Sequence, residues 1–87
     1  MYAWVRTEFD GVTFRVYPED HDPPHVHGRY QGVVVILELG KDGRVRLAER
    51  WDAIQPNDAK RNHVGHIFSA ANAHFDGLME LWEEAHA

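Results

Sequence analysis

Apolar and polar side chains alternate along the first half of the chain, with the two-residue period of β-strands. The clearest case is residues 12–17, where Val12, Phe14 and Val16 share one face. The preceding Asp10-Gly11 pair is a strong hairpin signal. Further strands are predicted at residues 2–9, 25–30, 33–39 and 44–50. The near-continuous apolar run of the fourth predicted strand indicates a central position, and the more polar last strand suits an edge.

The second half has helical periodicity. Apolar residues from Val64 onward fall on one stripe, which predicts a helix over residues 57–86 that packs against the sheet. Gly65 and Gly77 each weaken this helix by roughly 1 kcal/mol relative to alanine, so it can kink or break near either glycine. The stripe consists of Val64, Ile67, Phe68, Ala71, Phe75, Leu78, Met79 and Trp82.

Together these patterns predict a single α+β domain over residues 1–87. Residues 1–50 form an antiparallel β-meander of four or five strands, and one long C-terminal helix covers one face of this sheet. A chain of 87 residues has room for one domain with a moderate core.

Composition narrows the chemistry. The chain has no cysteine, which excludes disulfides, cysteine–zinc sites and thiol nucleophiles. No stretch has the length of a membrane span and the N-terminus lacks a signal pattern, so we expect a cytoplasmic protein without membrane contact. The net charge of −5 is not the usual footprint of a nucleic-acid-binding protein. Basic residues nevertheless gather between Arg29 and Arg61, which leaves a local basic surface open as an alternative.

The segment from Asp20 to His27 concentrates the titratable groups. It reads Asp-His-Asp-Pro-Pro-His-Val-His, with two prolines that stiffen the backbone. Histidine titrates near neutrality and serves as acid, base or metal ligand. A functional site is therefore predicted here, against the alternative of a polar surface loop.

Strand periodicity places His25, His27 and Arg29 on one face, which Arg15 and Tyr17 can join from the second predicted strand. Histidines with arginine and no strong nucleophile match metal-free phosphodiester cleavage, in which two histidines move protons and arginine stabilises charge on phosphorus. The alternative is that these side chains form only the solvated face of a one-sided sheet.

A metal site is a further alternative that uses the same segment. His25 and His27 at alternate strand positions can reach one divalent ion such as zinc, and His21, Asp20 or Asp22 can complete the ligand set. The spacing is not a recognised zinc signature, so this alternative ranks below metal-free cleavage and no cofactor is expected. His86 lies at a terminus that is expected to fray, and no role is assigned to it.

These features together resemble a bacterial family, domain of unknown function 4160. Its hallmark is histidine, any residue, two prolines, histidine, any residue and histidine, which falls on His21, Pro23, Pro24, His25 and His27. The resemblance implies a toxin of a type II toxin–antitoxin pair, neutralised by a small protein encoded nearby. This chain departs from the family pattern between Arg50 and His63 and in its helix glycines, so roles on the helix are the least transferable.

The sequence-based hypothesis is thus a toxin that cleaves RNA without a metal. Its candidate catalytic residues are His21, His25, His27, Arg29, Arg15 and Tyr17. The alternatives are a non-catalytic binding module, for which an edge strand and Trp51 supply a surface, and a domain that binds metal through histidine. Candidate partners are the antitoxin-like neighbour, RNA and a second copy of the chain.

Overall fold

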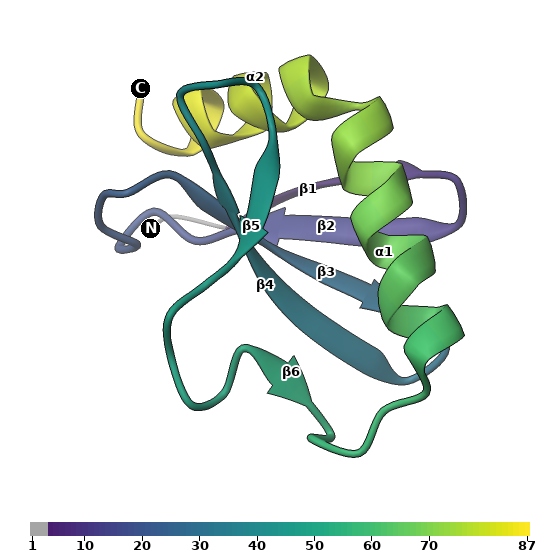
Figure 1. Cartoon of the computed structure of the whole chain (residues 1–87). Coiled ribbons are helices and arrows are strands. Elements are labelled where there is room, and N and C mark those ends of the chain that lie inside the picture. Colours follow the sequence, from purple (N-terminus) through teal and green to yellow (C-terminus); the bar gives the residue numbers. More distant parts are fainter. Residues whose placement is uncertain (1–3) are drawn as a thin grey trace.

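A computed structural model describes residues 4–87 of the chain (Figure 1). Its antiparallel sheet has the order β1-β2-β3-β4-β5, with β6 paired to β4 beside β5. The α+β class and the antiparallel strands of the sequence-based prediction are confirmed. Residues 2 and 3 of the first predicted strand lie outside the described residues. The strands are β1 (Val5–Phe9), β2 (Val12–Val16), β3 (His25–Tyr30), β4 (Val33–Leu39), β5 (Val45–Leu47) and β6 (Ile54–Gln55).

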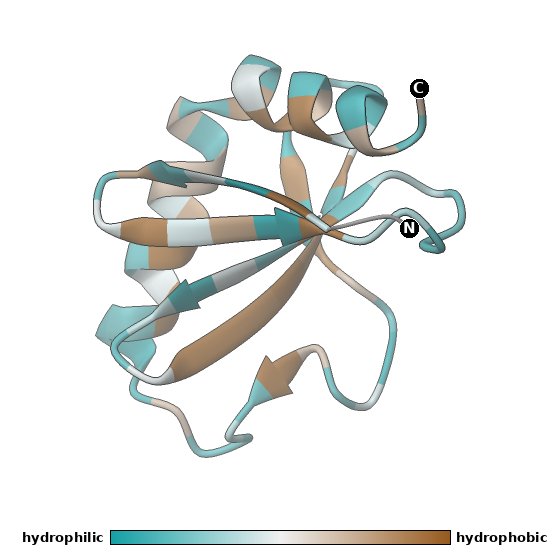
Figure 2. Ribbon diagram, turned by 180° about the vertical axis from the view of Figure 1, so that it is seen from behind, coloured by the Kyte–Doolittle hydropathy of each residue, from teal (hydrophilic) through white to brown (hydrophobic). Residues whose placement is uncertain are grey.

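The last strands differ from the prediction. The prediction of a single edge strand over residues 44–50 is wrong, because β5 spans only Val45–Leu47 and a short strand, β6, follows it. Residues 48–53 instead fold back over β4. The backbone N–H of Ile36 donates to the carbonyl of Ala53, and the carbonyl of Ile36 accepts from the backbone N–H of Ala48. β4 therefore bonds to β3, β5 and β6, which agrees with the central position expected from its apolar run (Figure 2).

The prediction of a single long helix is also wrong. The structure has α1 (Arg61–Ala73) and α2 (Phe75–Ala85), separated at His74 and running in clearly different directions (Figure 1). The break lies at His74, three residues before Gly77, and His74 contacts the β1–β2 hairpin at this point. The His74 ring stacks on Phe9 at 4.2 Å between centroids, and its Nε2 lies 3.2 Å from Asp10 Oδ2. Residues 57–60, which were predicted as helix, precede α1 as turn and coil.

The main core lies between the helices and one face of the sheet. Its fully buried side chains include Phe14, Leu37, Ile67 and Leu78, from two strands and both helices. Burial of this kind is worth about 1.5–3 kcal/mol for each large side chain. No helix in the described part of the chain is long and apolar enough to cross a membrane.

Close packing between α1 and β3 requires a glycine in the strand. A Cβ added at Gly28 would lie 2.8 Å from Ile67 Cγ2 and 3.0 Å from Phe14 Cε1, so the helix approaches as near as the bare backbone allows. The opposite face of the sheet, which we call the second face, carries Arg15, His25 and His27 in the alternate positions of β2 and β3.

We expect Gly28→Ala to lower the free energy of unfolding by about 1–3 kcal/mol, the usual effect of overpacking a core. Gly65→Ala is the matched control, because a Cβ there meets no atom within 4 Å and the position lies inside α1. It should raise stability by about 1 kcal/mol. Urea denaturation of the two variants measures both effects, and equal stability of the two would contradict the packing account.

Candidate functional site

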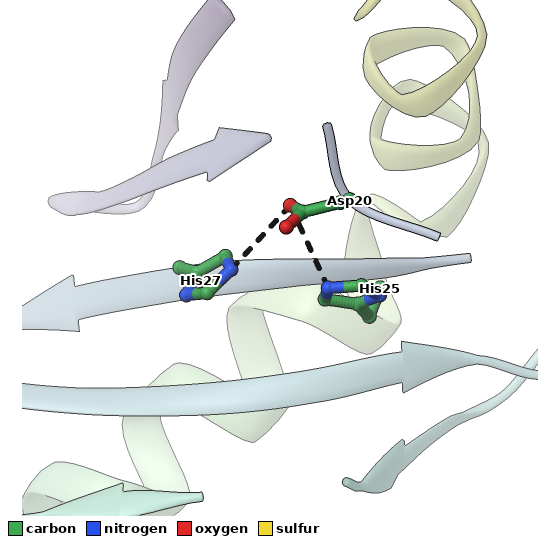
Figure 3. Close-up of side chains that lie close together, drawn as sticks. All are labelled: Asp20, His25 and His27. Atoms are coloured by element: carbon green, nitrogen blue, oxygen red, sulfur yellow. Dashed lines mark ion pairs between the residues drawn. The ribbon is translucent and has the colours of Figure 1, made fainter. Parts of the chain in front are cut away.

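Three side chains converge on the second face of the sheet (Figure 3). Asp20 Oδ2 lies 3.5 Å from His25 Nε2 and 3.6 Å from His27 Nε2. The side chains are largely shielded from solvent, with exposed fractions of 18% for Asp20, 13% for His25 and 20% for His27. We call Asp20, His25 and His27 the triad.

The strand period explains the placement of the two histidines. Val26 between them is fully buried in the core, so the flanking side chains project from the second face. Their rings stand 5.6 Å apart between centroids. Strand pairing extends this arrangement, because Arg15 lies opposite His27 in β2 and Glu38 lies opposite His25 in β4.

A local turn places the carboxylate of Asp20. The backbone N–H of Tyr17 donates to Asp20 Oδ2 at 3.1 Å, and the backbone N–H of Asp20 donates to the Tyr17 carbonyl at 3.0 Å. These bonds close the turn that leaves β2 and hold the carboxylate over the start of β3. The charged oxygen is therefore positioned before any ligand arrives.

The hydrogen bond on the other ring nitrogen of His25 determines its tautomer. Its Nδ1 lies 2.9 Å from the carbonyl oxygen of Pro23, which can only accept, so Nδ1 carries a proton. In the neutral ring Nε2 then has a bare lone pair, and it faces the Asp20 carboxylate. Such a bond from the distal nitrogen to a carbonyl is the usual support of a metal-binding histidine.

The surroundings of His27 favour its neutral form. Burial lowers its pKa, the nearby His25 and Arg50 add to that effect, and the opposing charge of Asp20 offsets it only in part. Its Nε2 is buried, and its nearest acceptor in the described structure, Asp20 Oδ2 at 3.6 Å, lies just beyond hydrogen-bond distance. A buried polar atom without a partner is costly, so it points to a missing ligand or proton.

The geometry of the triad suits a small divalent ion. The three ligand atoms all lie within 4.8 Å of one another. Tetrahedral zinc with bonds of about 2.0–2.2 Å separates its ligand atoms by about 3.3–3.6 Å, close to the two distances from Asp20 to the histidines. A cavity of about 340 Å³, with Asp20 and His25 in its wall, lies beside the triad and leaves room for a fourth ligand.

The predicted site residues are only partly brought together. The Tyr17 ring lies 5.2 Å from that of His27, and Arg15 is its cross-strand neighbour. His21 and Asp22 are exposed at the rim of the cavity and do not belong to the triad. Arg29 is exposed and lies opposite Thr13, farther along β3.

Sequence reasoning missed two contributors. Arg50 lies close enough to lower the pKa of His27, while its own Nη2 bonds Asp52 Oδ2 at 2.8 Å. His86, which was expected to fray, contacts the carbonyls of Trp82 and Asp20, each at 2.8 Å. Arg50 follows β5 and His86 follows α2, so both residues are remote in sequence from β3. No local motif therefore predicts their contribution to the site.

His86 holds the Asp20 turn against the end of α2. Because both ring nitrogens contact carbonyl oxygens, both bonds form only when the ring is protonated on both nitrogens. The bonds to Trp82 and Asp20 accordingly raise the pKa of His86, and the charges of Asp20 and Asp22 add to this effect.

Comparison with known proteins identifies the family. Residues 11–83 match the family model described as Domain of unknown function (DUF4160), which covers most of the chain. The chain therefore belongs to this family. No curated protein and no solved structure matches it.

The His86 contacts predict a pH-dependent stability. The raised pKa means that the folded state binds the proton more tightly than the unfolded chain. The stabilisation is therefore complete below the ordinary histidine pKa of 6.5 and is lost as pH rises through the higher pKa of the folded state. His86→Gln should thus destabilise the protein at acidic pH and have little effect at alkaline pH. Urea denaturation in chelator measures this, with His21→Gln as the control; an equal loss at both pH values would contradict the prediction.

Proposed function

We propose that this DUF4160 protein binds a divalent metal ion of the zinc class through Asp20, His25 and His27, and that the ion keeps one coordination position open for chemistry. The observation that carries the proposal is the convergence of three acceptor atoms on one point. Asp20 Oδ2 lies 3.5 Å from His25 Nε2 and 3.6 Å from His27 Nε2.

In the neutral tautomer of His25, the lone pair of Nε2 faces the Asp20 carboxylate, and either a proton or a metal ion would relieve the repulsion between them. A proton on His25 Nε2 would give one ion pair with Asp20, but it would leave the buried Nε2 of His27 without a partner. A metal ion satisfies all three atoms together. The tautomer that the Pro23 carbonyl selects in His25 favours the ion, since it leaves Nε2 free to coordinate.

Three protein ligands with an open fourth position are typical of catalytic rather than structural zinc sites. A bound ion of this type lowers the pKa of a coordinated water and supplies hydroxide near neutral pH. The cavity beside the triad offers space for that water and for part of a substrate. A metal-dependent hydrolase is therefore the activity that this arrangement supports best.

Metal-independent phosphodiester cleavage is the second candidate function. It would use His25 and His27 as acid and base, with Arg15, Tyr17 and Arg29 on the same face. The lowered pKa of His27 favours it, because a neutral imidazole is the state that a general base needs. A chelator separates the two functions, since it abolishes the first and leaves the second intact.

Metal binding is tested with tag-free protein, because a histidine tag binds the same ions. We expect zinc to raise the melting temperature of the wild type and of His21→Ala, and to raise that of His27→Ala or Asp20→Asn far less. Titration calorimetry should show affinity at least about 10-fold weaker in these two triad variants. Retention of full affinity in His27→Ala, or its loss in His21→Ala, would place the ion elsewhere or exclude the site.

A toxin role is a separate proposal, which rests on the family resemblance. Its partner would be the small antitoxin-like protein encoded nearby, and Trp51, which is 91% exposed, offers a surface for that partner. A non-catalytic binding partner of such a pair is the alternative.

Growth after induction tests the toxin role. We expect the wild type to arrest growth, co-expression of the neighbouring gene to restore it, and the His25→Ala, His27→Ala double variant to be harmless although folded by circular dichroism. Arrest by the double variant would separate toxicity from the triad, and unimpaired growth with the wild type would exclude the toxin role.

A further inference from the structure

Three arginines project from the second face of the sheet without a carboxylate partner. They are Arg6 on β1, Arg15 on β2 and Arg29 on β3. None forms an ion pair with any acid in residues 4–87. Arg46 and Arg50, in contrast, are each bonded to an aspartate, Asp42 and Asp52. Arg44 and Arg61 also lack an ion pair, but they lie outside β1 to β3, so Arg6, Arg15 and Arg29 are the unpaired arginines on the face that carries the triad.

Two of these arginines form a like-charge pair. Arg6 and Arg15 are directly opposite each other in the β1–β2 register, an arrangement that destabilises an antiparallel sheet when nothing neutralises it. Glu8 also projects from this face, but it lies opposite Thr13 and forms no ion pair with either arginine. Neither arginine of the pair therefore forms an ion pair within residues 4–87.

An aromatic ring holds both guanidinium groups. Arg15 Cζ lies 4.5 Å from the centroid of the Trp4 ring, and Arg6 Cζ lies 5.9 Å from it. Trp4 is itself 39% exposed, and Arg15 Nε is buried without a hydrogen-bond partner in the described structure. Stacking on the ring restricts the guanidinium groups and so lowers the entropy lost when an anion binds.

The arginine pair continues into the triad. Arg6, Arg15 and His27 are successive cross-strand neighbours on β1, β2 and β3, and we call them the arginine row. The Tyr17 ring connects the same region, 6.5 Å from Trp4 and 5.2 Å from His27. On the other side of the triad the cavity wall includes Glu38 and Glu49. The same wall includes Arg50, which is paired with Asp52, so acidic groups predominate there and the arginine side is the more favourable one for an anionic phosphate.

We infer that the arginine row binds the phosphodiester backbone of a single-stranded nucleic acid and brings one phosphate beside the triad. Guanidinium groups bind phosphate through paired N–H donors, and an exposed tryptophan offers a stacking surface for an unpaired base. An anion would also neutralise the like-charge pair. Binding to the row stands alone, whereas delivery of the phosphate to a metal ion rests on the proposed function.

Fluorescence anisotropy with labelled decauridylate RNA tests this inference, in chelator and again with zinc. We expect the wild type to bind at low salt in both conditions. Arg6→Gln and Arg15→Gln should each weaken binding several-fold and lower the slope of log affinity against log salt by about 1. Arg61→Gln at the start of α1 is the matched control for net charge and should bind like the wild type. A duplex of the same length should bind more weakly.

The outcomes separate the two proposals. Arginine-dependent binding in chelator, together with no zinc affinity, would support the row and overturn the metal centre. Zinc binding without RNA binding would overturn the row and leave the metal centre intact. An equal loss in Arg61→Gln would overturn the row by showing a response to net charge alone. Circular dichroism checks that the variants are folded, and Arg6, being exposed, keeps the test valid if Arg15→Gln unfolds.

Discussion

The two-residue period of β3 is the constraint on which the rest of the structure depends. Val26 and Gly28 face the helices, where Gly28 leaves just enough room for Ile67, and His25 and His27 must therefore face the other way. A slip of one residue would bury both histidines and expose the core positions together. The packing of α1 thus specifies the direction of the His25 and His27 side chains.

The third member of the triad depends on a different kind of control. Asp20 is placed by a turn that Tyr17 closes, and that turn is held from outside by His86 at the end of α2. The carboxylate is consequently sensitive to the charge state of a residue at the far end of the chain. The histidines belong to a rigid strand and the carboxylate to a clamped turn, so the two halves of the site differ in how firmly they are held.

Most of the strands and the shared face of His25 and His27 could be predicted, because both follow from local alternation. The third member of the triad could not be predicted, because the sequence offers Asp20, His21 and Asp22 as equivalent candidates. The hydrogen bond from the Tyr17 backbone distinguishes Asp20 from the other two. The exact position of the helix break could not be predicted for a similar reason. Propensity directs attention to Gly65 and Gly77, whereas contacts of His74 with Phe9 and Asp10, more than sixty residues away, locate the break.

The two faces of the sheet obey different rules, and this difference is the best physical support for a function on the second face. Among residues 4–87 no polar or charged residue is fully buried, so the core face consists of apolar side chains that need no hydrogen-bond partner. The second face holds the converging side chains of the triad, the opposed arginines, and two buried atoms without a hydrogen bond in the described structure, Arg15 Nε and His27 Nε2. Departures from local rules that gather in one place are expected where a ligand supplies the missing interaction. A cation at the triad would satisfy its three ligand atoms, and an anion on the arginine row would neutralise the opposed arginines. Because the two ligands carry opposite charges, they would attract each other when bound side by side.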